Sequence, residues 1–471
     1  MQWLQKIYIA ILNPFCGISE RINPKIKKRM IYITCFLLYV TCYCWYSIIG
    51  MGTPLTLLSR MLESIALIVI LIFLGLEKPL KPVKWNKLVV YTWFALGMLI
   101  FIMGFFNEQN TGYWMTGPVI ALGFPCFYMV YGKQEKYEMI FDAVCKSAAI
   151  ISIIYFFICL SGEYFSDNVW DTSNRYNGLT IDANKIGELC LASFCCLIYF
   201  LHVNANKIWK VINIISLGMI VSQVYFTQSR TTILAMIFIL GFYFVILLKD
   251  SITVKKAGII LKPAGALLIA VVIALLSSNV ISLVHTNYQD AQLVSISESG
   301  NSNAVMESEQ ASENVQDEPS AEDVEYRDLL PEKGADMNSF SSGRIFIWQT
   351  YAEGFNWIGN PADAEVPISP LIRQRTAHNS LVEITYRSGY ITGAVYLLLV
   401  MITGIYILRV LFRNNSKNRN GDYFMAITSI GYIIFTSLMS SFNPLTAIIF
   451  LLYAIAFPVM LEDRKTAKEL T

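Results

Sequence analysis

Three polar side chains could together carry a group-transfer reaction: Arg230, Arg344 and His378. A guanidinium stays charged at neutral pH, and its fork of N–H donors matches the oxygens of a phosphate. An imidazole titrates near neutral pH and can take a proton from an attacking hydroxyl group as a general base. Two guanidiniums and an imidazole on one surface would suit a lipid-linked donor: the arginines would hold the leaving diphosphate, and the histidine would activate the acceptor.

Simpler explanations compete with this chemistry. Arg230 stands at the edge of an apolar run, where an Arg commonly ends a helix and extends to the membrane surface. Arg344 could equally mark the start of a helix. His202 and His285 lie at the ends of predicted spans, and packing or an interfacial position explains them better than catalysis.

His378 differs from the other two histidines in its neighbours. It follows Arg373 and Arg375 in a polar segment and precedes Asn379. These three neighbours are therefore candidates for binding substrate. Trp348 is a further candidate, because its ring could stack on a sugar, although aromatic residues also anchor segments at membrane interfaces.

Neither a metal nor a cofactor is predicted. The predicted outer loops contain no Asp-x-Asp cluster that would suit a metal–nucleotide site. The ten Cys lie in or near apolar runs or in the N-terminal segment, without the partners of a metal site or a disulfide framework. The near-neutral net charge of +2 gives no sign of a nucleic-acid partner.

The elements that must position these residues are membrane helices. The chain is 55% hydrophobic and only 15% charged, and apolar runs near the bilayer-spanning length recur along it. A span must satisfy its own backbone hydrogen bonds, so an all-α polytopic membrane protein is predicted. About twelve spans are expected, roughly at 30–50, 57–76, 88–106, 113–131, 139–160, 186–203, 208–227, 231–248, 258–284, 390–412, 423–440 and 445–461.

The placement of Lys and Arg predicts the topology. Basic residues concentrate in alternate short connections, whereas Asn107–Gly112 and Ser441–Pro444 have none. The positive-inside rule therefore places both termini in the cytoplasm. The arginines expected on the outer side are Arg60, Arg175, Arg230, Arg344, Arg373, Arg375 and Arg387.

The long outer loop divides into two unlike halves. Between Thr286 and Ser342 there are 13 acidic residues against two basic ones, a composition that cannot bury enough apolar surface to order itself. The second half has an apolar helical face that includes Ile345 and Phe355, and a further helix is expected over Ala377–Ser388. The predicted segments are a cytoplasmic or interfacial 1–29 with a short helix, a membrane domain of nine spans at 30–285, an acidic disordered 286–340, an ordered 341–389 with the candidate catalytic residues, three spans at 390–461, and a cytoplasmic tail at 462–471.

Several short motifs, taken in order, resemble one family. They are Ser229-Arg230-Thr231-Thr232 at a helix start, Gly343-Arg344 with Trp348 four residues later, and His378-Asn379-Ser380-Leu381 before a span. This pattern resembles the O-antigen ligase / O-antigen polymerase family, over about residues 160 to 440. The run from Arg175 through Gly178 to Asn184 is similar to a recurring outer-loop motif of those proteins.

The resemblance implies a bacterial inner-membrane glycosyltransferase whose site faces outward. Its donor would be a polyprenyl-diphosphate-linked oligosaccharide and its acceptor a glycan or lipid-glycan, with membrane lipids around it and a chain-length regulator as a further candidate partner. Arg230 and Arg344 would contact the diphosphate, His378 would assist the acceptor hydroxyl, and Arg175 would bind substrate. A single displacement would invert the sugar carbon.

Three functions remain open on the sequence. A polymerase is preferred to a ligase only because nothing identifies a lipid A core partner. A transporter or flippase of lipid-linked oligosaccharides is the alternative from another class. It would be expected to place charges deep within its spans and often to show internal repeats. No repeat is visible here, and the deep charges are few: Glu63, Asp142, Lys146 and Glu188.

Overall fold

The structure is a computed structural model. It describes residues 2–45, 55–109, 111–162, 164, 169–170, 175–180, 182–203, 206–303, 344–361, 364, 366–367, 373–374, 377–413, 419–438 and 447–461. For residues 44–45, 55–61, 111–112, 288–303, 367, 373–374 and 419, only the backbone is described.

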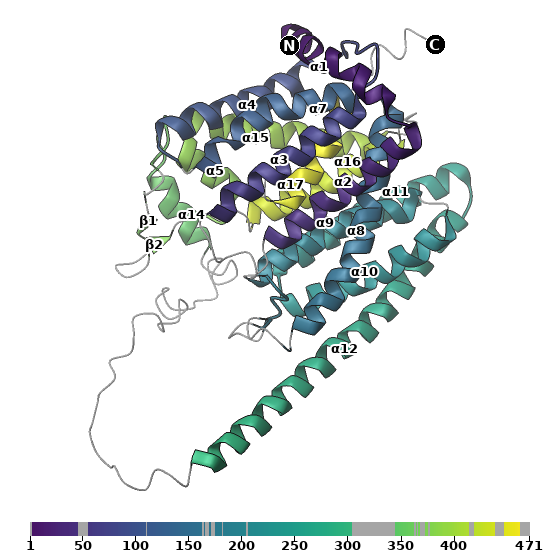
Figure 1. Ribbon diagram of the computed structural model, residues 1–471, viewed down its shortest axis with the longest axis vertical. Coiled ribbons are helices and arrows are strands. Elements are labelled where there is room, and N and C mark those ends of the chain that lie inside the picture. Colours follow the sequence, from purple (N-terminus) through teal and green to yellow (C-terminus); the bar gives the residue numbers. More distant parts are fainter. Residues whose placement is uncertain are drawn as a thin grey trace.

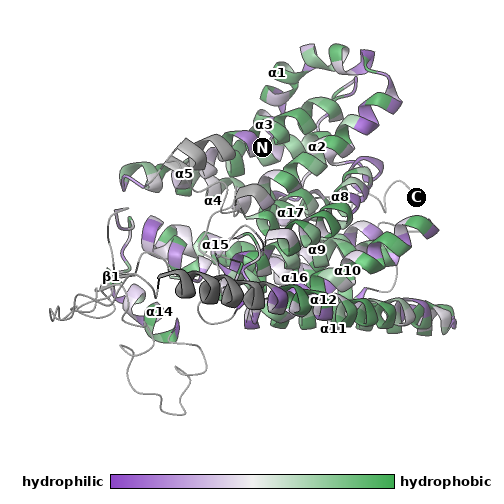
Figure 2. Cartoon of the chain, turned by 60° about the horizontal axis from the view of Figure 1, so that its bottom comes forward, coloured by the Kyte–Doolittle hydropathy of each residue, from purple (hydrophilic) through white to green (hydrophobic). Residues whose placement is uncertain are grey.

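The described chain forms a bundle of long helices, and apolar residues dominate it (Figures 1 and 2). In chain order the helices are α1 (Gln2–Arg21), α2 (Pro24–Trp45), α3 (Leu55–Gly75), α4 (Lys87–Phe106), α5 (Thr111–Trp114), α6 (Thr116–Pro118), the π-helix η2 (Val119–Gly123), α7 (Phe124–Tyr131), α8 (Gln134–Gly162), α9 (Ala183–Val203), α10 (Lys207–Thr227), α11 (Arg230–Val254), α12 (Gly258–Asn303), α14 (Arg344–Glu353), α15 (Ser380–Phe412), α16 (Arg419–Leu438), α17 (Ile448–Ala456) and α18 (Pro458–Leu461). Two short antiparallel strands, β1 (Val366–Pro367) and β2 (Arg373–Gln374), lie between α14 and α15.

Seven of the described helices are long and apolar enough to cross a membrane, which agrees with a helical membrane protein. They are α4, α8, α9, α10, α11, the first part of α12 and α15. Helix α9 lies at the centre of the bundle: every residue from Ile186 to Leu201 is buried. The helix therefore provides a fixed base for the loop that precedes it.

Two helices run longer than expected. Helix α12 ends at Asn303, well beyond the predicted end at 284 and inside the stretch predicted to be disordered, and residues 304–343 lie outside the described residues. Helix α1 has 20 residues in place of a short segment. It continues because Leu4, Tyr8 and Cys16 share a face that is buried against the bundle.

The span expected at 113–131 is broken into α5, α6, η2 and α7. Pro118 lacks a backbone N–H and favours a local departure from α-helical bonding, which the π-helix provides. At this point α6 lies very close to α4, since a Cβ on Gly117 would be 2.5 Å from the carbonyl oxygen of Gly97. Small residues allow this approach between the two helices.

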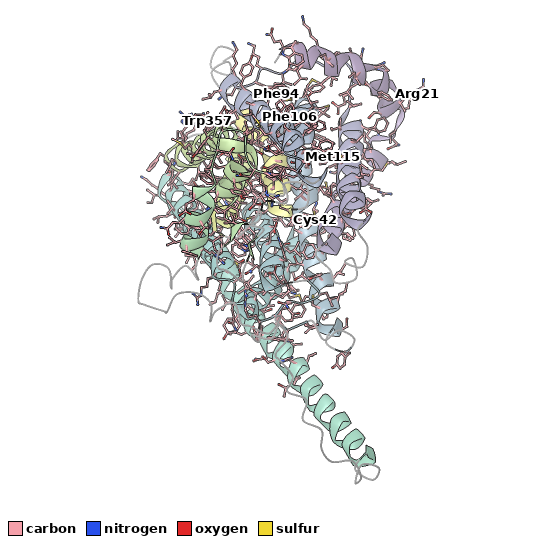
Figure 3. The ribbon with its side chains drawn as sticks, turned by 90° about the vertical axis from the view of Figure 1, so that its left-hand side faces the viewer. Arg21, Cys42, Phe94, Phe106, Met115 and Trp357 are labelled. Carbon is pink, nitrogen blue, oxygen red and sulfur yellow. The ribbon has the colours of Figure 1, made fainter. Side chains whose placement is uncertain are left out.

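The helix expected over 377–388 is present as the first turns of α15. It begins at Ser380 and breaks at Gly389, whose φ of 83° is left-handed, before the chain continues as the long apolar part of α15. A Cβ on Gly389 would lie 2.1 Å from the carbonyl oxygen of Trp357, so the loop after α14 lies tightly against the kink. Figure 3 labels Trp357 in this loop and Phe106 at the end of α4, and just beyond that end the Asn107 side chain donates to the carbonyl oxygen of Ile358 (2.5 Å).

Candidate functional site

Four predicted site residues from distant parts of the chain gather at one end of the bundle. Arg344 lies within electrostatic range of Arg175 and Arg230, and its charge also acts on His378. We call this group the cation cluster: Arg175, Arg230, Arg344 and His378. Loop 175–180, the α10–α11 turn, the start of α14 and the start of α15 contribute one residue each.

Arg175 is held by the ends of two helices. Its Nε donates to the carbonyl oxygen of Thr227 at the end of α10 (3.1 Å), and its Nη2 donates to Asn184 Oδ1 in the first turn of α9 (3.2 Å). The next residue, Tyr176, donates its N–H to the carbonyl oxygen of Phe226 (3.0 Å). The loop is thus attached to the end of α10, next to the turn that carries Arg230.

Arg230 is the first residue of α11 and is exposed. Gln228 turns the chain between α10 and α11 with a left-handed φ of 51°. The hydroxyl groups of Ser229 and Thr232 are 2.9 Å apart, and a Cβ on Gly187 of α9 would lie 2.6 Å from the Thr232 hydroxyl oxygen. Close packing on α9 therefore fixes the turn, while the guanidinium remains accessible.

Arg344 begins α14 and donates from Nη1 to the carbonyl oxygen of Leu438, the last residue of α16 (2.7 Å). A helix C-terminus carries partial negative charge, so a cation is favoured there. Burial, and then the positive charges of Arg175 and Arg230, lower the pKa of Arg344 from its ordinary value. A guanidinium loses its proton only at very high pH, so Arg344 still carries its positive charge at neutral pH.

His378 has a left-handed backbone, with φ of 50°. For a residue with a Cβ this conformation costs on the order of 1–2 kcal/mol, so neighbouring contacts must maintain it. Ala377 provides two of them: its N–H donates to Glu383 Oε2 (2.7 Å), and its carbonyl oxygen accepts from Trp348 Nε1 (2.9 Å). Asn379 follows as the N-cap of α15.

Asn379 fixes the other side of His378. Its Oδ1 accepts from the backbone N–H groups of Leu381 (2.9 Å) and Val382 (3.1 Å), and its Nδ2 donates to the carbonyl oxygen of Ser437 (2.7 Å). Both Asn379 and Trp348 were predicted to bind substrate. In the structure their polar groups position His378, so their contact with a substrate stays a prediction.

The environment of His378 favours a neutral imidazole. Burial, and then the positive charge of Arg344, lower the pKa of His378 below its ordinary value of 6.5. The carboxylates of Glu383 and Asp182 act in the opposite direction, and Lys185 acts with Arg344. The net effect is downward, which favours the neutral imidazole at neutral pH, the form that can act as a base.

The two remaining predicted residues are less well placed. Arg373 lies in β2, paired with Pro367, and only its backbone is described. Arg375 lies outside the described residues. Of the residues that the structure describes, no group of three or more His, Cys, Asp and Glu could hold a metal ion.

A largely buried ion pair joins Glu383 to Arg387 close to His378, and this pairing was not predicted from the sequence. Glu383 accepts from Arg387 Nε, and Arg387 Nη1 donates to Gln109 Oε1 beyond the end of α4 (2.8 Å). The guanidinium carbon also lies 5.7 Å from the ring centre of Tyr113. The spacing of Glu383 and Arg387, four residues apart on a helix, was the available sequence signal.

Glu383→Gln is expected to destabilise the protein by roughly 3 kcal/mol, because Arg387 would stay buried without its carboxylate. Replacing both, as Glu383→Gln with Arg387→Met, should recover part of this loss. Thermal unfolding of the purified protein measures both effects, with Glu353→Gln on the exposed side of α14 as the matched control. Equal melting temperatures for Glu383→Gln and Glu353→Gln would show that the pair contributes little.

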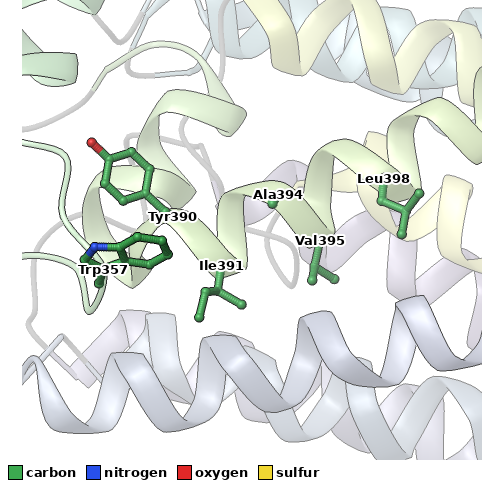
Figure 4. A pocket seen from close by; sticks show the side chains of 6 residues that line it. All are labelled: Trp357, Tyr390, Ile391, Ala394, Val395 and Leu398. Carbon is green, nitrogen blue, oxygen red and sulfur yellow. The ribbon is translucent and has the colours of Figure 1, made fainter.

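An open apolar groove of about 380 Å³ runs along α15 just past the kink. Trp357 and Tyr390 lie at one end of it, and Ile391, Val395 and Leu398 follow along the helix (Figure 4). Apart from the indole N–H of Trp357 and the hydroxyl of Tyr390, the side chains that line the groove are apolar. It is the kind of surface that an acyl or prenyl chain in a bilayer would cover.

Comparison with known proteins adds no assignment. No protein-family model matches the chain, and no curated protein matches it. The function is therefore argued from the site itself.

Proposed function

We propose that the protein is a metal-independent, inverting glycosyltransferase of cell-surface polysaccharide assembly. It transfers or polymerises glycan repeat units carried on polyprenyl diphosphate, at the outer face of the bacterial cytoplasmic membrane. The observation that carries the proposal is the cation cluster, in which Arg175, Arg230 and Arg344 come together beside His378. Three neighbouring guanidiniums repel one another, and a bound diphosphate would replace that repulsion by attraction.

In the proposed reaction, the oxygen of an acceptor hydroxyl bonds to the anomeric carbon of the donor. The bond from that carbon to the diphosphate oxygen breaks, and the electron pair leaves with the polyprenyl diphosphate. His378 takes the hydroxyl proton, and the guanidiniums stabilise the charge on the leaving group. One displacement of this kind inverts the anomeric carbon.

The proposal includes a membrane arrangement of about twelve spans with both termini in the cytoplasm and the cation cluster outside. Basic residues at the opposite end of the bundle support it. Lys136 donates to the carbonyl oxygen of Gly75 at the end of α3 (2.8 Å), and Lys249 donates to that of Leu411 near the end of α15 (2.8 Å). Cytoplasmic loops are the ones enriched in Lys and Arg.

We also propose membership in the O-antigen ligase / O-antigen polymerase family, supported by the motifs around Arg230, Arg344 and His378. A polymerase is preferred to a ligase, because nothing in the chain identifies a lipid A core partner. A polymerase would extend one lipid-linked repeat unit with another, and a chain-length regulator is a candidate partner for that activity.

Reconstitution tests the proposal. The purified protein is placed in liposomes with a polyprenyl-diphosphate-linked repeat unit that carries a radiolabelled sugar. A polymerase gives labelled products that increase in size by one repeat at a time and releases polyprenyl diphosphate. Movement of the labelled lipid between leaflets without any larger product would instead identify a transporter. Transfer only to added lipid A core would identify a ligase.

The pH dependence of glycan extension should follow the protonation of His378. The neutral imidazole is the active form, so kcat/KM should be constant at neutral pH and fall as the pH drops through the lowered pKa of His378. In Arg344→Gln the lost positive charge would let that pKa rise, and the acid limb should move to higher pH. A diphosphate diester keeps both charges between about pH 5 and 8, where a His titrates, so the substrate adds no titration of its own. If the fall in kcat/KM at acid pH occurs at the same pH in Arg344→Gln as in wild type, the assignment of His378 as the base is contradicted.

A further inference from the structure

A pocket of about 490 Å³ opens beside the α10–α11 turn. Aromatic rings from three segments form its wall: Trp170 from the loop before α9, Tyr225 and Phe226 from the end of α10, and His285 from α12. The rings of Trp170 and His285 are in contact, with centres 4.2 Å apart and planes tilted by 32°, and Phe226 meets Trp170 edge-on. Tyr225 is 69% exposed, so its ring is free to meet a ligand.

The rest of the lining is polar and carries no formal charge. Gln228, Ser282 and Thr286 place an amide and two hydroxyl groups at the pocket, and all three are exposed. None of the described lining residues is Asp, Glu, Lys or Arg. Such a lining offers little to a phosphate or a carboxylate. It suits a sugar ring, whose apolar faces pack on aromatic side chains and whose hydroxyls bond to amides and hydroxyls.

The pocket shares its turn with the cation cluster. Arg175 Nε donates to the carbonyl oxygen of Thr227, which lies between Phe226 and Gln228 in the chain. Gln228 in turn stands two residues before Arg230. A ligand whose diphosphate lay on these arginines would therefore have its glycan within reach of the pocket.

We propose that this pocket binds a sugar ring of the lipid-linked donor glycan, next to the diphosphate. The inference rests on the proposed function for the identity of the glycan, while the sugar-binding chemistry comes from the lining alone. It also gives His285 a role beyond interfacial packing, because its ring supports the Trp170 face of the pocket.

The test separates binding from catalysis. The probe is the oligosaccharide released by mild acid from the polyprenyl-diphosphate fraction of the producing cells. Its binding to the full-length protein is followed by saturation-transfer NMR in a detergent without a sugar headgroup. Tyr225→Ala removes an exposed ring, and Gln228→Asn shortens the amide while keeping a residue type that tolerates the left-handed turn. Tyr164→Ala is the matched control, because Tyr164 is 64% exposed and does not line the pocket.

Wild type, Tyr164→Ala and His378→Ala should bind the oligosaccharide alike, and Tyr225→Ala and Gln228→Asn should bind roughly five- to tenfold more weakly. Absence of binding to wild type, or equal binding by Tyr225→Ala and Tyr164→Ala, would overturn the proposal. If the oligosaccharide binds in a Tyr225-dependent way but the protein never extends a glycan, the sugar-binding pocket is supported and the proposed function is refuted.

Enzyme kinetics with a donor and an acceptor supplied as two different compounds distinguish binding of the donor glycan from binding of the acceptor glycan. Tyr225→Ala should raise KM for the lipid-linked donor roughly five- to tenfold with little change in kcat, since the ring would contribute binding in both ground and transition states. A rise in KM for the acceptor alone would overturn the assignment to the donor.

Discussion

His378→Asn is expected to lower the rate of glycan extension by about 10²–10⁴-fold, the usual contribution of a general base. Asn is the sharper substitution here, because it tolerates the left-handed backbone that His378 adopts, whereas Ala at this φ adds strain. The hydrogen bonds of Ala377 to Glu383 and Trp348 involve backbone atoms of a neighbouring residue and should survive. Extension is measured in the liposome assay, alongside the melting temperature.

His202→Ala is the matched control for this experiment. His202 lies in the last turn of α9, edge-on to Tyr243 and Tyr423, whereas Arg175 is bound to Asn184 in the first turn of the same helix. Its removal should leave extension unchanged. Full activity in His378→Asn would exclude a role for the imidazole as the base. If His378→Asn is active and His378→Ala is inactive, the residue is needed for its backbone conformation.

Arg344→Gln should show the second large effect, a loss of about 10²–10³-fold in kcat, as expected when one group that stabilises developing charge is removed. Gln retains an N–H donor for the carbonyl oxygen of Leu438, and the substitution relieves repulsion from Arg175 and Arg230. The melting temperature should therefore stay constant or rise while activity falls. This opposite movement is typical of a residue retained for function at a cost in stability.

Arg344→Lys and Arg413→Gln complete the design. Lys restores the charge without the fork of donors, so it should recover only part of the activity. Arg413 caps the far end of α15 and is exposed, and its replacement should change nothing. A loss of activity that merely follows a loss of stability in Arg344→Gln would make Arg344 a structural residue.

The apolar periodicity of the sequence predicted most of the described helices, because the length of an apolar run sets the length of a span. It missed the continuation of α12 to Asn303, since backbone hydrogen bonds can extend a helix beyond its apolar part. The break of the span at 113–131 was not predicted either: Pro118 disfavours regular α-helical bonding, but a proline alone does not specify a π-helix.

For the site, residue type identified Arg230, Arg344 and His378, and the topology expected from basic residues placed them on one side. What the sequence could not supply was contact between distant segments. Nothing in the local pattern shows that Arg344 meets Leu438, or that the amide of Asn379 meets Ser437, because tertiary packing alone brings these segments together. The pocket beside Gln228 was not predicted from the sequence for the same reason, since its rings come from three separate segments.

Arg344 and Asn379 donate to the carbonyl oxygens of two consecutive residues, Leu438 and Ser437. The segments that carry Arg344 and His378 are therefore both attached to the end of α16, in addition to the hydrogen bond from Trp348 to the carbonyl oxygen of Ala377 that joins them within the loop. In this arrangement the end of α16 is a common attachment point for both segments. Insertions or deletions in the connecting chain that leave the contacts of Trp348 and Trp357 intact should therefore preserve the geometry at its two ends.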